Sequence, residues 1–196
     1  GKTELVEFSI SSQNDVSLDV SQCSSLVYFW DYNGCVTNLD ASQCSSLDHY
    51  SYSYDNSRDL KHINLSGCTS LRYVEIYGDY NDYTEEVYKT INIQKLNIQD
   101  CIALENISIH YTTLKNLDVS TCKSLSVLGC ARNQLRVLNV SGCTNLYMLS
   151  CNDNQLTNLN VSGCTNLEYL YCENNQITSE IPSWFSQLLS FTHDVR

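Results

Sequence analysis

Apolar residues recur along this chain in a unit of 21 residues. One unit runs through Leu146, Leu149, Cys151, Leu156, Leu159, Val161 and Cys164. Its part LYMLSC alternates polar and apolar side chains with a period of two, which is typical of a short β-strand. The polar NDNQ that follows predicts a turn, and LTNLNV predicts a second extended piece. Since a 21-residue unit has no room for a long helix beside these parts, we predict an extended or 3-10 return segment.

One nine-residue motif marks the start of each unit. It reads LDVSQCSSL at position 18 and LNVSGCTNL, unchanged, at positions 138 and 159; related copies start at 39, 63, 96 and 117. The steps between starts are 21, 24, 33, 21, 21 and 21 residues, so two units carry insertions, near residues 53–59 and 78–90. A divergent unit, LVEFSI, precedes the first motif. We therefore predict about eight rungs that stack as parallel strands over residues 1–178.

The pattern LxxLxCxxNxL resembles the leucine-rich repeat family. It occurs as LSVLGCARNQL, LYMLSCNDNQL and LEYLYCENNQI, and it is similar to the short 21-residue, cysteine-bearing bacterial repeat of internalin J-like surface proteins of gut anaerobes. The resemblance spans residues 5–177. It implies a right-handed leucine-rich repeat solenoid, assigned by convention to the α/β class but mostly β here. The parallel sheet would lie on the concave face, with extended or 3-10 segments on the convex side.

Earlier units depart from this pattern. Asp31 stands where the later units have Cys130, Cys151 and Cys172. The asparagine of the later units is replaced by Gln13, Gly34, Asp55, Asp79 and Thr112.

Two columns of repeated residues are expected to be structural. The side-chain amides of Asn133, Asn154 and Asn175 both donate and accept, so they can bridge adjacent rungs where a turn leaves buried backbone groups. Most cysteines also fall in columns. One contains Cys130, Cys151 and Cys172, and the other contains Cys23, Cys44, Cys68, Cys101, Cys122, Cys143 and Cys164.

A ladder of reduced, buried thiols is the favoured interpretation of these cysteines. Equivalent residues in neighbouring rungs are about 4.8 Å apart, but their Cβ vectors run parallel, so each disulfide would distort the backbone. Free cysteine packs as a small apolar residue. Metal binding or a redox role is the alternative. Cys35 lies outside both columns, and we expect it to be exposed and open to modification.

Charge and motif content narrow the function. The chain has 11 Lys and Arg against 22 Asp and Glu, a net charge of −11, which disfavours nucleic acid as a partner. No apolar run is long enough to insert into a membrane. We find no catalytic motif, no metal site and no indication of a cofactor, because the histidines are scattered and the serines simply repeat with the unit. Residues 1–10 do not resemble a secretory signal, so we expect any signal or anchor segment to have been removed from this chain.

Function is expected where the rungs differ. Side chains alternate along a strand, so the positions flanking each inward pair point outward onto the concave face. Aromatic residues gather there on the second and fourth rungs, with serines between them as a shallow trough. The candidate ligand-binding residues are Tyr28, Trp30, Tyr32, His49, Tyr73, Glu75, Tyr77, Tyr169 and Tyr171. The alternative is that the rings only stabilise the sheet by stacking across rungs.

Two further segments interrupt the repeat. The insertion GDYNDYTEEVYKT, at 78–90, is predicted to be a polar flap over the trough or a passive solvated loop. Residues 179–196 are predicted to form a C-terminal cap. Pro182 at a first helical turn and Trp184, Phe185, Leu188 and Leu189 at helical spacing favour a short amphipathic helix there.

The resemblance implies a non-enzymatic, secreted or cell-surface adhesion or recognition module that binds a protein of a host or of the bacterial surface. The alternative is a glycan-binding module, in which Trp30 and nearby tyrosines stack on sugar rings and Glu75 binds hydroxyl groups. An acidic surface favours a protein partner with basic patches.

Overall fold

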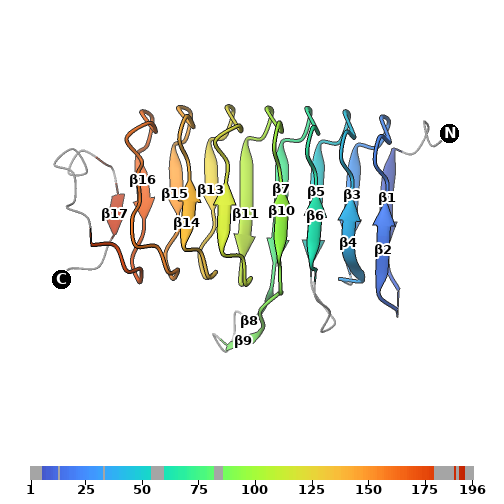
Figure 1. The fold of residues 1–196 in the computed structure, drawn as a ribbon, viewed down its shortest axis with the longest axis horizontal. Coiled ribbons are helices and arrows are strands. Elements are labelled where there is room, and N and C mark those ends of the chain that lie inside the picture. Colours follow the sequence, from blue (N-terminus) through green and yellow to red (C-terminus); the bar gives the residue numbers. More distant parts are fainter. Residues whose placement is uncertain are drawn as a thin grey trace.

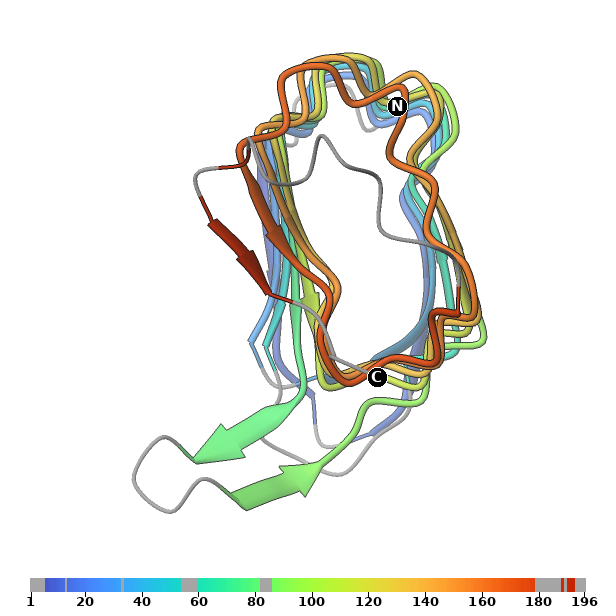
Figure 2. The same cartoon turned by 90° about the vertical axis from the view of Figure 1, so that its left-hand side faces the viewer.

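The computed structural model describes residues 6–12, 14–32, 34–53, 60–81, 86–178, 188 and 190–192. Within these ranges the chain forms strands and turns and no helix. Figure 1 shows the rungs stacked side by side along one axis, and Figure 2, viewed along that axis, shows successive rungs tracing the same outline. The predicted parallel solenoid is confirmed. The described residues contain no helix with the length and apolar character that a membrane crossing requires.

One side of the coil is a nine-stranded parallel sheet, which we call the front sheet. Its first eight strands belong to the eight predicted rungs, one strand to each. Each strand is short because the repeat allows only one extended piece before the next turn. In sheet order the strands are β1 (Glu7–Ile10), β3 (Tyr28–Asp31), β5 (His49–Ser53), β7 (Tyr73–Tyr77), β11 (Asn106–His110), β13 (Val127–Gly129), β15 (Met148–Ser150), β16 (Tyr169–Tyr171) and β17 (Ser190–Thr192).

The opposite side carries the return segments, and these are extended as predicted. Four of them form a sheet in the order β10 (Lys95–Asn97), β6 (His62–Asn64), β4 (Val36–Asp40) and β2 (Val16–Asp19). Two more, β12 (Asn116–Asp118) and β14 (Val137–Asn139), form a separate two-stranded sheet. We call this side the back. The back strands that pair within each of these two sheets are in register, with a single shift between β2 and β4.

The insertion at 78–90 contains an antiparallel pair, β8 (Asp79–Asn81) and β9 (Glu86–Lys89). Figure 2 shows this pair projecting away from the coil, from the edge at which β7 ends. The sequence predicted a flap or a passive loop at this place. The structure shows a hairpin whose backbone pairs with itself instead of continuing the back sheet.

The core fills the space between front and back. Leu128, Leu149 and Leu170 sit at the same register position of three neighbouring front strands, and each is fully buried. Burying a leucine side chain contributes about 1.5–3 kcal/mol. Because every rung repeats this inward position, the core is one continuous column along the axis.

The cysteines lie inside this column. All eleven are free and buried. In the longer column each thiol after Cys23 points toward a backbone carbonyl of the preceding rung. The sulfur-to-oxygen distance is 3.1 Å for Cys44 to Val20, Cys68 to Ala41 and Cys101 to Leu65. Burial raises the pKa of Cys44 to about 11, and it raises the pKa values of Cys68 and Cys130 to about 12. These thiols therefore stay protonated, which removes the reactive thiolate.

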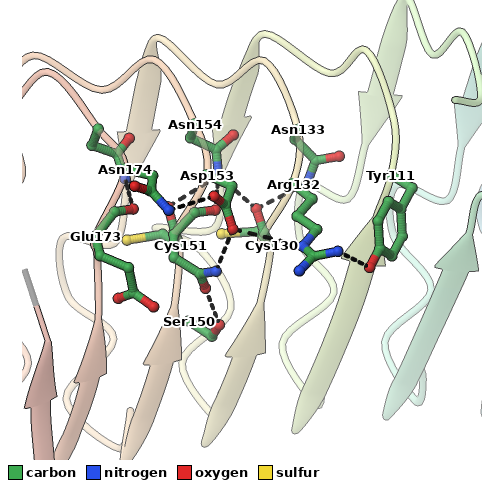
Figure 3. Close-up of polar contacts among 12 residues, drawn as sticks. Tyr111, Cys130, Arg132, Asn133, Ser150, Cys151, Asp153, Asn154, Glu173 and Asn174 are labelled. Carbon is green, nitrogen blue, oxygen red and sulfur yellow. Dashed lines mark hydrogen bonds and ion pairs between the residues drawn. The ribbon is translucent and has the colours of Figure 1, made fainter. Parts of the chain in front are cut away.

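The asparagine column joins consecutive rungs (Figure 3). Nδ2 of Asn154 donates to the carbonyl oxygens of Cys130 and Cys151, at 2.9 and 3.0 Å, and its Oδ1 accepts from the backbone N–H of Leu135 at 2.9 Å. Asn133 and Asn175 make corresponding contacts. The three side chains are each less than 10% exposed. One amide thus satisfies backbone groups of two rungs at once.

The prediction that Cys35 is exposed is wrong. Cys35 is completely buried, because Asp31, only 1% exposed, turns inward and organises the loop between them. Oδ1 of Asp31 accepts from the backbone N–H of Cys35 at 3.2 Å, and Oδ2 accepts from the N–H of Val36 at 2.9 Å. Tyr52 completes the arrangement by donating to the carbonyl of Gly34 at 3.3 Å. In this rung a carboxylate satisfies backbone donors, a task that amides perform in the later rungs.

The predicted cap falls mostly outside the described residues. Pro182, Trp184, Phe185 and Leu189 are not among them, and the helix is not confirmed. Leu188 is half-buried against the core, and β17 adds a ninth parallel strand beside β16. The part of this segment that is described therefore covers the last rung with a strand.

Candidate functional site

The register of the front sheet brings residues of the second, third and fourth rungs together. Tyr28 is level with His49, and His49 is level with Tyr73. One step along the strands, Trp30, Ser51 and Glu75 share a second row. Parallel strands lie about 4.8 Å apart, so neighbours in a row are in contact range.

Five rings form a continuous group, which we call the aromatic cluster: Tyr28, Trp30, Tyr32, His49 and Tyr73. Along its own strand, Trp30 lies nearly parallel to Tyr28 and to Tyr32, with ring centroids 6.0 Å apart in both pairs. Across the rungs, the centroid of Trp30 is 4.7 Å from His49, and His49 is 5.6 Å from Tyr73. Trp30 thus has aromatic neighbours on three sides, and the cluster forms one rigid surface.

The outer parts of this surface face solvent. Tyr28 is 39% exposed and Tyr32 is 54% exposed, whereas Trp30 and His49 are half-buried. Tyr77, at 40%, extends the aromatic surface toward the fifth rung by stacking on His110 with centroids 5.6 Å apart. Burial lowers the pKa of His110, which keeps that ring uncharged at neutral pH.

Polar groups border the cluster on one side. Nε2 of His49 lies 3.4 Å from Oε2 of Glu75, close enough for ionic attraction when the imidazole is protonated, but without the alignment of a hydrogen bond. Ser51 separates Trp30 from Glu75 in the row, so a small side chain lies between a ring and a carboxylate that is 41% exposed. The Glu75 carboxylate can accept a hydrogen bond from a ligand that lies over Ser51.

Arg72, which directly precedes β7, supports the cluster, and the sequence analysis missed it. Its guanidinium carbon is 5.1 Å from the centre of the Tyr73 ring. Its Nε and Nη2 donate to the carboxylate of Asp48, at 2.5 and 3.1 Å. This bidentate pair, one rung apart, raises the pKa of Arg72. The periodic pattern contained no signal for it, because Asp48 and Arg72 occupy a variable position directly before the front strand of each rung.

The structure does not bring the last two candidates to the cluster. Tyr169 and Tyr171 belong to β16, four strands away from β7 in the sheet order. Tyr169 instead packs edge-on against Tyr147, with centroids 5.0 Å apart. They form a separate aromatic group near the end of the solenoid.

A second group missed by the sequence analysis follows the asparagine column on the surface. Arg132 donates through Nη1 to the hydroxyl of Tyr111 at 2.6 Å, and its Nε lies 3.6 Å from Asp153. Asn174 donates to the other oxygen of Asp153 at 2.7 Å, as Figure 3 shows. All four residues have positive φ, between 55° and 57°. Each of the four directly precedes the asparagine-column position of its rung. This shared position in the repeat is the sequence signal that could have identified them.

Metal coordination finds no support among the described residues. No three His, Cys, Asp or Glu side chains come together there in a way that could hold an ion. The histidines of the front sheet contact aromatic rings instead.

Comparison with known proteins agrees with this fold. The leucine-rich repeat family model, described as Leucine Rich repeats (2 copies), matches residues 144–187. Among solved structures, the functional domain of internalin J (InlJ) from Listeria monocytogenes, described as including a cysteine ladder, is 25% identical with a TM-score of 0.64. The match covers 95% of this chain and 38% of that one. The chain is thus similar to the internalins in its leucine-rich repeat fold.

A second internalin, InlF of Listeria monocytogenes strain 4b F2365, is 20% identical with a TM-score of 0.47. That match covers 99% of this chain and 62% of the other. No curated protein matches the sequence. The chain thus spans well under two thirds of the internalin J structure, and a source in gut anaerobes stays a prediction.

Proposed function

We propose that this chain is a non-enzymatic recognition module, secreted or held at the cell surface, that binds a protein partner through the front sheet. The aromatic cluster carries the proposal. It offers rigid, partly exposed tyrosine and tryptophan side chains on a parallel sheet, and these residue types dominate the energetics of protein interfaces. The internalin-like fold supports the same class of function.

The geometry of Trp30 favours a protein partner over a glycan. A sugar that stacks on tryptophan needs an open ring face, but Trp30 is half-buried and has Tyr28, Tyr32 and His49 around it. The more exposed members are Tyr28 and Tyr32, whose side chains carry a hydroxyl group beside apolar carbon. Such surfaces suit the mixed contacts of a protein interface.

The acidic rim supports a partner with basic groups. Glu75 lies beside the cluster, and the whole chain has a net charge of −11. Charge of one sign steers a partner of the opposite sign and speeds association. We therefore expect binding to weaken as salt rises.

The test compares wild type with a Tyr28→Ala, Trp30→Ala, Tyr77→Ala variant in host-protein pull-downs and on a glycan array. A matched control variant, Tyr147→Ala with Tyr169→Ala, removes aromatic groups at the far end of the sheet. We expect a protein ligand that binds wild type and the control, loses at least tenfold in affinity for the triple variant, and binds more weakly in salt. Circular dichroism and thermal unfolding establish that all three proteins are folded.

Two outcomes contradict the proposal. Equal binding of every ligand to the triple variant and wild type would assign the cluster a purely structural role. A salt-insensitive glycan ligand that quenches tryptophan fluorescence in wild type, and fails to bind the triple variant, would make the chain a glycan-binding module.

A further inference from the structure

A groove of about 970 Å³ lies on the back of the solenoid, on the opposite side from the aromatic cluster. It is lined by the return segments of three consecutive rungs, those of β10, β12 and β14, and it includes the opening between β10 and β12. One wall includes Gln94, Lys95 and Leu96, and the other includes Lys115, Asn116 and Asp118. Its volume is at the upper end of the roughly 300–1,000 Å³ that ligand sites occupy.

The back strands are normally joined by a regular ladder. Between β6 and β10, the backbone N–H of Lys95 donates to the carbonyl of Lys61 at 3.0 Å. Directly after β6, the N–H of Leu65 donates to the carbonyl of Asn97, the last residue of β10, at 2.8 Å. In a parallel pair such bonds alternate evenly along both strands.

This ladder is interrupted at the groove. The equivalent bonds would run from Asn116 N–H to the Gln94 carbonyl and from Ile98 N–H to the Asp118 carbonyl, and the described residues form neither. β10 is accordingly the last strand of one sheet and β12 the first of another. The interior reflects the same separation, since the thiol of Cys122 is 4.0 Å from the Ile98 carbonyl, compared with 3.1 Å for the same pair one rung earlier.

A side-chain ladder breaks at the same place, and this break has a chemical reason. Nδ2 of Asn97 donates to Oδ1 of Asn64 at 3.0 Å, and Nδ2 of Asn139 donates to Oδ1 of Asp118 at 3.1 Å. Asp118 is the next member after Asn97, but an ionised carboxylate has no N–H to donate. The opening is bounded at both ends, where Thr113 N–H donates to the Ile91 carbonyl and Asp100 N–H donates to Oγ1 of Thr121.

The groove is also basic, although the chain is acidic. Lys95 and Lys115 line it, both are exposed, and neither has a carboxylate of the described residues within 4.0 Å. The acid in the lining, Asp118, already accepts from the N–H of Ser120 at 2.9 Å and from Asn139. Although burial raises the pKa of Asp118, these hydrogen bonds outweigh it and leave the pKa below its ordinary value.

We propose that this groove binds an acidic peptide segment in an extended conformation. Its carboxylates would pair with Lys95 and Lys115. Its backbone would bond main-chain groups that the break leaves without a ladder bond, the Gln94 carbonyl and the Asn116 N–H. Unpaired strand edges accept an added peptide through main-chain hydrogen bonds. An anionic polysaccharide could pair with the lysines but would leave those main-chain groups unsatisfied. The site goes beyond the proposed function, because it lies on the other side of the coil.

The test measures fluorescence anisotropy of a labelled peptide of alternating glutamate and valine. We expect it to bind wild type in a salt-sensitive manner, and the Lys95→Glu, Lys115→Glu variant to bind at least tenfold more weakly. A Lys123→Glu variant is the matched control, since Lys123 is an exposed lysine outside the groove. Control binding should equal that of wild type. Thermal unfolding establishes that each variant is folded, and a Lys95→Gln, Lys115→Gln variant repeats the test without reversing charge.

Several results would overturn the proposal. They are no binding of the peptide to wild type, equal binding to both groove variants, or an equal loss in the Lys123→Glu control. A sulfated oligosaccharide of matched charge that binds more tightly than the peptide would reassign the groove to polysaccharides. An N-methylated peptide tests the backbone contacts, and unchanged affinity would remove them from the proposal. Variants of the aromatic cluster should bind the peptide as wild type does, so the two sites can fail separately.

Discussion

The two halves of the solenoid hold their consecutive rungs together with different side chains. In residues 127–175, inward cysteines and amides of the asparagine column repeat in each rung, with Asn154 bonding backbone groups of two rungs. In residues 28–77, the position of the inward cysteines holds Asp31, Tyr52 and Ile76, and the asparagine position of the second rung holds Gly34. The contacts in residues 28–77 differ from rung to rung, because each inward side chain there has a different partner.

This difference shows where the chain is free to vary. The later rungs repeat because the stack requires the same hydrogen bonds at each step. The earlier rungs depart from the repeat inside, at Asp31, and also outside, at the aromatic cluster. The aromatic residues on the outside contribute less to the stability of the stack, since Tyr28 and Tyr32 are partly exposed. Four predictions test the comparison.

The largest effect is expected for Asn154→Ala in the regular half. The change leaves the Cys130 and Cys151 carbonyls and the Leu135 N–H without this partner. At about 1–3 kcal/mol for each buried group, the free energy of unfolding should fall by about 3–5 kcal/mol. Urea unfolding measures this loss. The exposed Asn158→Ala change is the control and should stay within about 0.5 kcal/mol of wild type. A comparable loss in the two variants would show that the asparagine column does not stabilise the stack.

In the irregular half, Asp31→Ala should reduce the free energy of unfolding by about 2–4 kcal/mol. The backbone donors of Cys35 and Val36 would lose their acceptor inside the core. Asp31→Asn should cost less, because the amide keeps one acceptor oxygen. Chemical denaturation of wild type, Asp31→Ala and Asp31→Asn measures the three free energies of unfolding. Equal stability of Asp31→Ala and wild type would refute the prediction. The Asp31→Ala variant should also make Cys35 reactive toward a thiol reagent.

The third effect concerns pH. Burial raises the pKa of Cys130 from an ordinary 9.0 to about 12. A thiol with a raised folded pKa contributes stability that is complete below about pH 9 and is lost as pH rises toward 12, since the unfolded state releases its proton first. The expected slope is about 1.4 kcal/mol per pH unit for each such thiol. Denaturation between pH 8 and pH 11 should show a shallower slope for Cys130→Ala with Cys151→Ala. Parallel slopes would show that these thiols ionise equally in both states.

The smallest effect is expected for Tyr32→Ala. Tyr32 is 54% exposed and contacts Trp30 through one parallel ring pair. Such a pair contributes about 0.5–1.5 kcal/mol, so thermal and urea unfolding should change by about 1 kcal/mol or less. A loss above about 2 kcal/mol would favour the alternative in which the cluster exists to hold the sheet together.

Much of the site was predictable because alternation along a strand is local. Once the front strand of each rung is placed, the outward direction of Tyr28, Trp30 and Tyr32 follows from the period of two. Tyr169 and Tyr171 also point outward, but they belong to the eighth predicted rung, and the order of the rungs already separates them from β7 by four strands. The support from Arg72 could not be predicted from the sequence, because it depends on a contact with Asp48 of the preceding rung.

The sequence by itself determined the period, the parallel stack and the residues that face the core, because all three follow from a repeat that is readable without knowing any neighbour. Tertiary structure alone decided that Cys35 is buried, that the insertion pairs as β8 and β9, and that the back sheet breaks beside Asp118. The physical reason is that each of these depends on how one rung meets the next. Hydrogen bonds between rungs require donors and acceptors at matching heights, and a repeat pattern specifies the residue types but not the local offset.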